Sequence, residues 1–289
     1  MFHGSIVALV TPMHEDGSVD FESYQKLLDF HVHNQSDGVV IVGTTGEAPT
    51  IDFDEHIKLI EEGVKYINGR IPVIAGTGAN STKEAIYLTA KAKELGADAC
   101  LLVTPYYNRP NQEGLYQHFK AINDGVSIPQ ILYNVPCRTG CDLHNDTVIR
   151  LSKLENIVGI KDATGDIKRI NSLKREVNND FSLISGDDKT FLNFLEQGGH
   201  GVISVTANVV PNMMHNICHK IFTGNIEEAK SMNDQLIELH NLMFVEPNPI
   251  PVKWTLFHMN LIKSYIRLPL VELDSKYHQK IINCLSDVL

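Results

Sequence analysis

The stretch GADACLLVTPYYNRPNQEGLYQHFKAIND (residues 96–124) contains the structural unit that decides the fold of this chain. Its apolar run at 98–104 is nearly continuous, as expected for a parallel strand that is covered on both faces. A helix-ending signal, Gly96-Ala97-Asp98, precedes the run, and an amphipathic pattern at 111–124 follows it after a short loop. The stretch therefore predicts one strand followed by one helix.

The same order of strand and helix recurs along the chain. We predict strands at about 5–10, 38–43, 71–76, 98–104, 129–134, 157–161, 181–185 and 201–205. Amphipathic patterns at 20–33, 54–67, 81–95 and 111–124 predict helices between them, and Ser81 before Glu84 is typical of a capping box. These units predict an α/β fold, the TIM (β/α)8 barrel. An open doubly wound sheet is the alternative, but it usually carries a glycine-rich loop where this chain has Thr11-Pro12-Met13-His14.

The C-terminal part of the chain departs from this alternation. After residue 211 the pattern is purely helical, at about 211–222, 225–244, 250–263 and 276–288. This is more helix than an eighth unit requires. We therefore predict a barrel over 1–223 and a C-terminal helical extension over 224–289.

Composition limits the partners of the chain. Its 289 residues contain 25 lysines and arginines and 35 aspartates and glutamates, a formal charge of −10. An acidic chain without a basic block is a poor candidate for nucleic acid, and it has no apolar run long enough to span a membrane. The five scattered cysteines, and a strand pattern at the N-terminus where a signal peptide would lie, indicate a cytoplasmic protein.

Two patterns resemble metal sites only superficially. Neither Cys137-x-x-x-Cys141 nor the trio of His215, Cys218 and His219 has a second ligand pair at zinc-site spacing. Surface helix residues and packed thiols are the better interpretation. We therefore expect no metal and no cofactor.

Lys161 ends the apolar run Ile157-Val158-Gly159-Ile160. Ammonium groups are almost never fully buried without a partner. Desolvation lowers the pKa of an amine, and a neutral amine attacks carbonyl groups to form Schiff bases. A shift from about 10.4 to about 7–8 is worth around 4 kcal/mol, which only a structured site supplies. A lysine that reaches solvent is the alternative, but the position of Lys161 among the other strand ends favours catalysis.

Polar residues follow several other predicted strands, at the end of the barrel where active sites lie. Gly43-Thr44-Thr45-Gly46 can offer N–H groups and hydroxyls to a small carboxylate, Tyr133 can move protons, and Arg138 suits a carboxylate. Taken singly, each has a plain alternative as a turn, a packed ring or a solvated charge. The acidic loop Gly186-Asp187-Asp188 would repel phosphate, so we expect a small, non-phosphorylated keto acid as substrate.

Longer segments carry a specific resemblance. They are VGTTGE (42–47), IPVIAGTGAN (71–80), VTPYYNRPNQEGLYQHFKAI (103–122), ILYNVPCRTG (131–140), GIKDATG (159–165), SGDD (185–188), GGHGVISVTAN (198–208) and FVEPNPIPVKW (244–254). In this order they resemble the 4-hydroxy-tetrahydrodipicolinate synthase family, also called dihydrodipicolinate synthases, of bacterial lysine biosynthesis. The resemblance runs from Gly4-Ser5-Ile6 to the C-terminal helices.

The resemblance implies catalytic roles for four residues. Lys161 would form a Schiff base with pyruvate, and Tyr133 would donate and accept protons. Thr44 would link Tyr133 to Tyr107, which the family contributes from a neighbouring subunit.

The resemblance also implies the substrate-binding residues. Thr45 and the backbone of Ile203 would bind the pyruvate carboxylate, and Gly186 would lie beside the substrate. Arg138 would bind the carboxylate of L-aspartate 4-semialdehyde. Sugar-acid lyases such as N-acetylneuraminate lyase share the barrel and the lysine and are the alternative, but Arg138 favours the synthase. A barrel retained only as a scaffold is the third interpretation.

In feedback-inhibited relatives L-lysine binds a cleft between subunits. The equivalent residues here are Pro49, Phe53, His56, Gly78, Asn80, Glu84 and Tyr106. Glu84 suits the α-amino group, but Phe53 cannot replace a polar contact, so we expect lysine inhibition to be retained and weakened. The resemblance further implies a homotetramer built as a dimer of tight dimers, with a dimer as the alternative.

Overall fold

The computed structural model describes residues 1–289 and confirms the predicted barrel. Its parallel strands pair in chain order, and β8 pairs with β1 to close the sheet. They are β1 (Gly4–Ala8), β2 (Gly38–Ile41), β3 (Val73–Gly76), β4 (Ala99–Val103), β5 (Gln130–Asn134), β6 (Ile157–Asp162), β7 (Ser182–Ser185) and β8 (Gly201–Ser204). All the predicted strands exist, and most are shorter than predicted.

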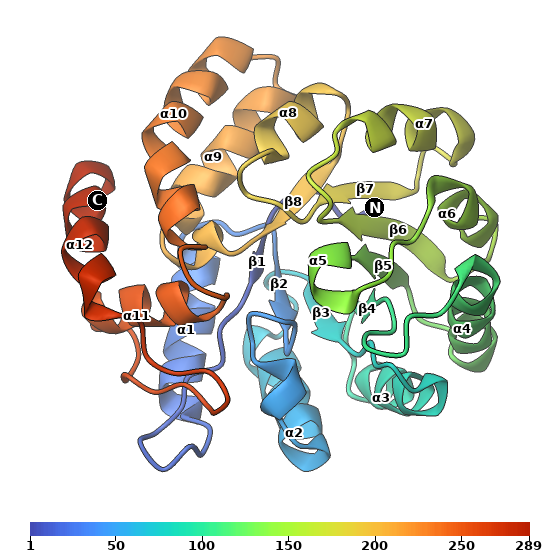
Figure 1. The fold of residues 1–289 in the computed structure, drawn as a ribbon, viewed down its shortest axis with the longest axis horizontal. Helices are drawn as coiled ribbons and strands as arrows, with labels where there is room; N and C mark the ends of the chain where they lie inside the picture. The colour runs from blue at the N-terminus through green and yellow to red at the C-terminus, as the bar shows by residue number, and fades with distance from the viewer.

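Helices surround the strands, as Figure 1 shows. Those of the barrel are α1 (Phe21–His33), α2 (Phe53–Ile67), α3 (Thr82–Glu94), α4 (Gln112–Gly125), α5 (Pro136–Thr139), α6 (Asn145–Leu151), α7 (Lys168–Glu176), α8 (Phe191–Glu196) and α9 (Pro211–Phe222). Then follow α10 (Ile226–Leu242), α11 (Ile250–His258) and α12 (His278–Val288). Short 3₁₀ turns are η1 (Ala48–Thr50), η2 (Thr206–Asn208) and η3 (Ser275–Tyr277).

Side chains of the strands alternate between two apolar layers. In β1, Ile6 and Ala8 face the barrel interior, whereas Val7 packs in the larger cluster between strands and helices. Successive strand residues point to opposite faces, and here both faces are covered. This explains why the strands read as continuous apolar runs. Tyr133 belongs to the interior layer, which places its ring under the barrel mouth.

Helix starts agree in part with the sequence. The Ser81 hydroxyl accepts a hydrogen bond from the Glu84 N–H, so the predicted N-cap is present without the reciprocal bond of a full box. A complete capping box lies instead at Asp52 and Glu55, before α2. Such a reciprocal pair satisfies two N–H groups that the first turn leaves unpaired.

The predicted C-terminal helices follow the barrel and gather on one side of the ring (Figure 1). The predicted helix over 250–263 is too long, because α11 ends at His258. Asn260 takes a left-handed conformation with φ of 58°, and the Leu261 N–H donates back to the Leu256 carbonyl. This is a common way for helices to end. The division into domains at 223/224 stays a prediction. No helix combines the length and apolar character needed to cross a membrane.

Candidate active site

Lys161 and Tyr133 lie side by side at the C-terminal ends of β6 and β5. The two residues are register partners in the sheet, and the Lys161 Nζ lies 4.2 Å from the centroid of the Tyr133 ring. Each residue is only 6% exposed. The sheet therefore brings together the amine and the phenol that the sequence singled out.

Burial changes the acidity of both groups. It lowers the pKa of Lys161 from 10.5 to about 7, because the charged ammonium loses its water. The negative charge of Asp188 opposes this shift in the pKa, and the positive charge of Arg138 adds to it. Burial also raises the pKa of Tyr133 to about 12, against the effects of Arg138 and the Thr44 hydroxyl. Lys161 is thus available as a neutral amine near pH 7, while Tyr133 keeps its proton.

Gly186 leaves room for the Lys161 side chain. A Cβ atom at this position would lie 2.9 Å from the Lys161 Cε and 2.8 Å from the Ala163 Cβ. Its N–H donates to the Asp162 carbonyl at 2.7 Å, so the start of the β7 loop is joined to the end of β6. Only glycine fits between these atoms without a shift of the lysine.

Thr45 is held from the C-terminal extension. Its hydroxyl accepts a hydrogen bond of 2.9 Å from the Asn248 Nδ2, and both residues are buried. The Asn248 carbonyl in turn accepts a hydrogen bond of 3.1 Å from the Arg138 Nη2. One residue between α10 and α11 thus connects the hydroxyl and the guanidinium that the sequence assigned to two different carboxylates.

Glu47 fixes the same loop through a buried ion pair. The residue adopts a left-handed conformation with φ of 61°, and its Oε1 lies 2.5 Å from the Lys253 Nζ of α11. The Glu47 Oε2 accepts a hydrogen bond from the Arg267 N–H. Burial lowers the pKa of Lys253 below its ordinary value, and Glu47 opposes that shift. The extension therefore anchors the β2 loop by charge as well as by packing.

Sequence reasoning missed Asn248, Glu47 and Lys253. The segments that contain them, VGTTGE and FVEPNPIPVKW, were recognised. Contacts between residues more than 200 positions apart, however, cannot be predicted from the local sequence pattern. The signal that was available is the charge of Lys253 within the apolar run of α11. A lysine at such a position needs a partner.

The C-terminal ends of the strands open into one cavity of about 740 Å³. It is lined by the predicted residues Thr44, Thr45, Tyr133, Arg138, Lys161 and Gly186, and also by Pro49, Phe53, His56, Gly78, Glu84 and Tyr106. The lining combines apolar walls with a few polar groups, as small-molecule sites usually do. Most of the catalytic and regulatory candidates therefore border a continuous hollow within this chain.

The comparisons with known proteins identify the family of the chain. The model of the Dihydrodipicolinate synthetase family matches residues 1–288. The 4-hydroxy-tetrahydrodipicolinate synthase of Nitrosomonas europaea is 58% identical over 281 residues, which cover 97% of this chain and 96% of the relative. The chain belongs to the dihydrodipicolinate synthetase family.

Solved members of the dihydrodipicolinate synthetase family share the whole fold. The chloride-inhibited enzyme from Acinetobacter baumannii, in complex with pyruvate, has a TM-score of 0.98 and 52% identity, over 100% of this chain and 99% of that one. The enzyme from Cyanidioschyzon merolae, with lysine bound, has a TM-score of 0.97 and 36% identity over 100% and 99% of the two chains. The barrel and its C-terminal helices are thus common to the family.

Three predicted residues do not line the cavity. Tyr107 is 91% exposed, with a left-handed backbone at φ of 72°, and so lies outside the site of its own chain. Ile203 is buried in the apolar layer of the barrel interior. Asn80 is half-buried, and its Nδ2 donates to the Tyr106 carbonyl at 3.2 Å. The dihydrodipicolinate synthetase fold brings the others together.

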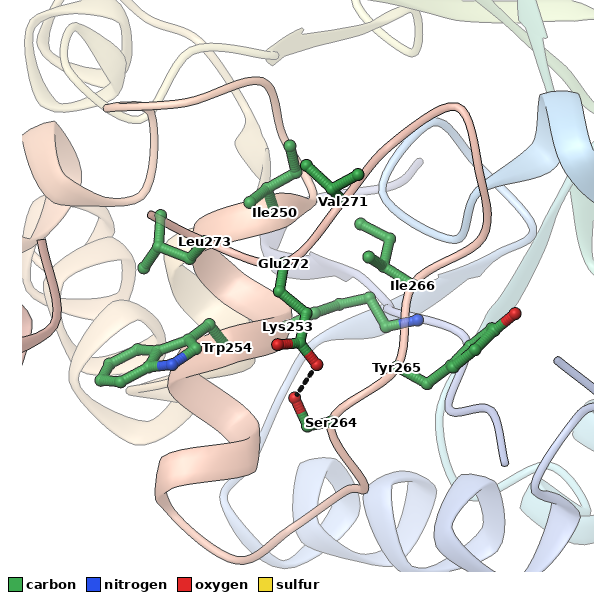
Figure 2. Close-up of a pocket in the computed structure, with 9 residues that line it drawn as sticks. All are labelled: Ile250, Lys253, Trp254, Ser264, Tyr265, Ile266, Val271, Glu272 and Leu273. Carbon is green, nitrogen blue, oxygen red and sulfur yellow. Dashed lines mark hydrogen bonds between the residues drawn. The ribbon is translucent and has the colours of Figure 1, made fainter. Parts of the chain in front are cut away.

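A second hollow lies in the C-terminal extension (Figure 2). It measures only about 10 Å³ and is lined by residues such as Trp254, Tyr265 and Leu273, with a hydrogen bond from the Ser264 Oγ to Glu272 at its edge. A space of this size holds about one water molecule. In this member of the dihydrodipicolinate synthetase family it is a packing gap.

The cysteine and histidine patterns set aside in the sequence have other surroundings in the structure. All five cysteines are free thiols. The His215 Nδ1 lies 3.0 Å from the Asp37 Oδ2, and its ring stacks on that of His219. These histidines belong to the outer helix α9, and neither lines the cavity.

Proposed function

We propose that this chain is a 4-hydroxy-tetrahydrodipicolinate synthase that works through a Schiff base on Lys161. The observation that carries the assignment of the lysine is its buried amine, 4.2 Å from the Tyr133 ring and with a pKa lowered to about 7. At that pKa about half of the amine is neutral at pH 7, against roughly one in 2,500 for an ordinary lysine. The pyruvate complex of the Acinetobacter baumannii relative supports the choice of first substrate.

The first half of the reaction forms the enamine. The neutral Lys161 Nζ adds to the C2 carbonyl of pyruvate, and the carbonyl oxygen leaves as water after protonation by Tyr133. The iminium then loses a methyl proton to the Tyr133 oxygen. The Thr45 hydroxyl, oriented by Asn248, is the proposed donor to the pyruvate carboxylate.

The second half joins the two substrates. The enamine carbon adds to the aldehyde carbon of L-aspartate 4-semialdehyde, whose oxygen takes up a proton. The amino group of this substrate then adds to C2 and displaces Lys161 as a free amine, which closes the ring. Arg138 is the proposed partner of the semialdehyde carboxylate, because its guanidinium lies at the cavity and is oriented by the Asn248 carbonyl.

Two measurements test the reaction and the residue. A coupled assay with pyruvate and L-aspartate 4-semialdehyde should show turnover, and N-acetylneuraminate should not be cleaved. Borohydride reduction in the presence of pyruvate should leave a covalent adduct on Lys161. The variant Lys161→Met should lose the adduct, and Lys153→Met, at an exposed lysine, should keep it. An adduct on another lysine, or none, would refute the proposed mechanism.

The proposed oligomer is a homotetramer built as a dimer of tight dimers, with a dimer as the alternative. Its support is Tyr107, which is 91% exposed and outside its own cavity, as a residue that completes a neighbour's site would be. Sedimentation should show an assembly larger than the monomer, and Tyr107→Phe should lower turnover.

The free thiols support the proposed cytoplasmic location, because disulfides are rare in that compartment.

L-Lysine is the proposed feedback inhibitor. The lysine-bound Cyanidioschyzon merolae enzyme supports this partner, and His56, Glu84 and Tyr106 border the cavity here. The Phe53 ring packs edge-on against the Tyr87 ring, with centroids 6.1 Å apart, and offers no polar contact. We expect weakened inhibition, which Phe53→His should strengthen. Equal rates with and without millimolar lysine would rule out the inhibition.

A further inference from the structure

The residues that directly follow Tyr133 and Lys161 form a polar cluster on the outer side of the barrel. Asn134 and Asp162 are register partners at the ends of β5 and β6, as Tyr133 and Lys161 are one step earlier. Because successive strand residues face opposite sides, Asn134 and Asp162 face the helices. Asn134 is fully buried and Asp162 is 7% exposed. Polar groups buried in this way require partners.

Arg169, in the first turn of α7, supplies a partner to the end of β6 and to the segment that follows α5. Its Nε donates to the Asp162 Oδ2 at 2.9 Å, and its Nη1 donates to the Asp142 Oδ2 at 3.1 Å. A third bond of 2.6 Å runs from Nη2 to the Leu143 carbonyl. The guanidinium side chain is only 15% exposed. Its planar set of donors suits such a multiple contact, and lysine cannot reproduce it.

Asn134 completes the connection on the side of β5. Its Nδ2 donates to the Asp142 Oδ1 at 2.7 Å, and its Oδ1 accepts a hydrogen bond of 3.0 Å from the Leu143 N–H. The segment that Arg169 holds is therefore the same segment that holds Asn134. A continuous chain of hydrogen bonds joins the end of β5 to the end of β6.

Asp162 also fixes the loop after β6. Its Oδ1 accepts hydrogen bonds from the Thr164 N–H at 2.8 Å and from the Thr164 Oγ1 at 2.5 Å. Its backbone carbonyl accepts from Gly186, the glycine against which the Lys161 stem packs. Fully satisfied buried networks of this kind rigidify their surroundings. The lysine side chain is long, so the position of its amine depends on how rigidly this strand end is held.

We propose that Arg169 is a positioning residue, whose guanidinium ties the end of β6 to the loop after β5 and so holds Lys161 against Tyr133. This inference rests on the proposed Schiff-base function of Lys161. Arg169 touches neither substrate nor the reacting atoms in this arrangement. It acts through the backbone of two neighbouring strands, one residue beyond each reactive side chain.

The test compares Arg169→Met and Arg169→Lys with Arg175→Met, which removes an exposed arginine from the same helix. Misplacement of a reacting group by about 1 Å can cost roughly 100-fold in rate. We expect Arg169→Met to lower kcat by about 10- to 100-fold with a smaller change in KM, Arg169→Lys to be intermediate, and Arg175→Met to equal the wild type.

The pH dependence of borohydride trapping with pyruvate is a second readout, which a purely structural role would not move. Loosening of β6 should admit water to the Lys161 amine, so the apparent pKa of adduct formation should rise in Arg169→Met. The charged groups that act on this amine, Asp188 and Arg138, are unchanged in the variant.

The outcomes separate the two proposals. Absence of an adduct in the wild type overturns the Schiff-base function itself. A normal adduct in the wild type, with kcat and pH profile of Arg169→Met equal to those of Arg175→Met, overturns the positioning role alone, even where Tm falls. Where Arg169→Met does not fold, Arg169→Lys and Asp142→Asn decide, because each weakens the same connection. A wild-type kcat and a wild-type pH profile in both Arg169→Lys and Asp142→Asn would refute the positioning role.

Discussion

Replacement of Lys161 by methionine should stabilise the folded protein at neutral pH while it abolishes adduct formation. Burial lowers the pKa of this lysine from 10.5 to about 7. Between pH 7 and pH 10.5 this lysine is therefore protonated in the unfolded chain and neutral in the folded chain. A fall in pH through this range favours unfolding, because the unfolded chain binds the additional proton. At about 1.36 kcal/mol per pKa unit, the folded state carries a penalty of about 5 kcal/mol at and below pH 7. Methionine is of similar length and carries no charge, so it removes the penalty and keeps most of the packing.

The sign of the pH dependence distinguishes this explanation from better packing alone. The stability of the wild type should rise with pH above 7, by about 1.4 kcal/mol per unit from this group, whereas Lys161→Met lacks this contribution. Urea unfolding of both proteins at pH 7, 8 and 9, at one protein concentration and without pyruvate, should show a gap that narrows as the pH rises. Lys153→Met, at an exposed site, should differ little from the wild type at each pH. A variant less stable than the wild type at pH 7, or a gap independent of pH, would show that the amine is not held neutral by burial.

Two further changes test how the site is built. Gly186→Ala should slow borohydride trapping by roughly 100-fold, because its Cβ would lie 2.9 Å from the Lys161 Cε. Gly125→Ala, whose Cβ would meet nothing closer than 3.5 Å, is the matched control, and equal trapping rates in the two variants would refute the steric argument. Glu47→Gln should lower the unfolding free energy by about 3–5 kcal/mol, since it leaves the buried Lys253 without its carboxylate. Urea unfolding should show most of this loss restored by the further change Lys253→Met, and a double variant no more stable than Glu47→Gln would contradict the charge argument.

Much of the fold was predictable because the barrel repeats one local pattern. Each strand is apolar on both faces, so its run of residues such as Ile157 to Ile160 stands out from the amphipathic helices. Helix ends were less predictable. The end of α11 depends on the left-handed conformation of Asn260. Asparagine tolerates this conformation, but its presence in a sequence does not predict it.

The candidate site was predictable where it lies at strand ends. Lys161, Tyr133 and Thr44 follow apolar runs, and closure of the sheet necessarily brings the ends of parallel strands together. Asn248 was not predictable in this way, since it lies in the extension, and its bond to Thr45 spans 203 positions of the chain. Contacts of that kind depend on how helices pack, which local pattern does not encode.

The sequence by itself determined the barrel and the acidic character and led to Lys161 as the proposed reactive amine, because these follow from hydrophobic periodicity, charge and residue chemistry. Only the tertiary structure decided what makes that amine reactive. Burial supplies the lowered pKa of Lys161, with Arg138 adding to it and Asp188 opposing it. Desolvation depends on every atom that surrounds a group in space, and those atoms come from strands, loops and helices far apart in the chain.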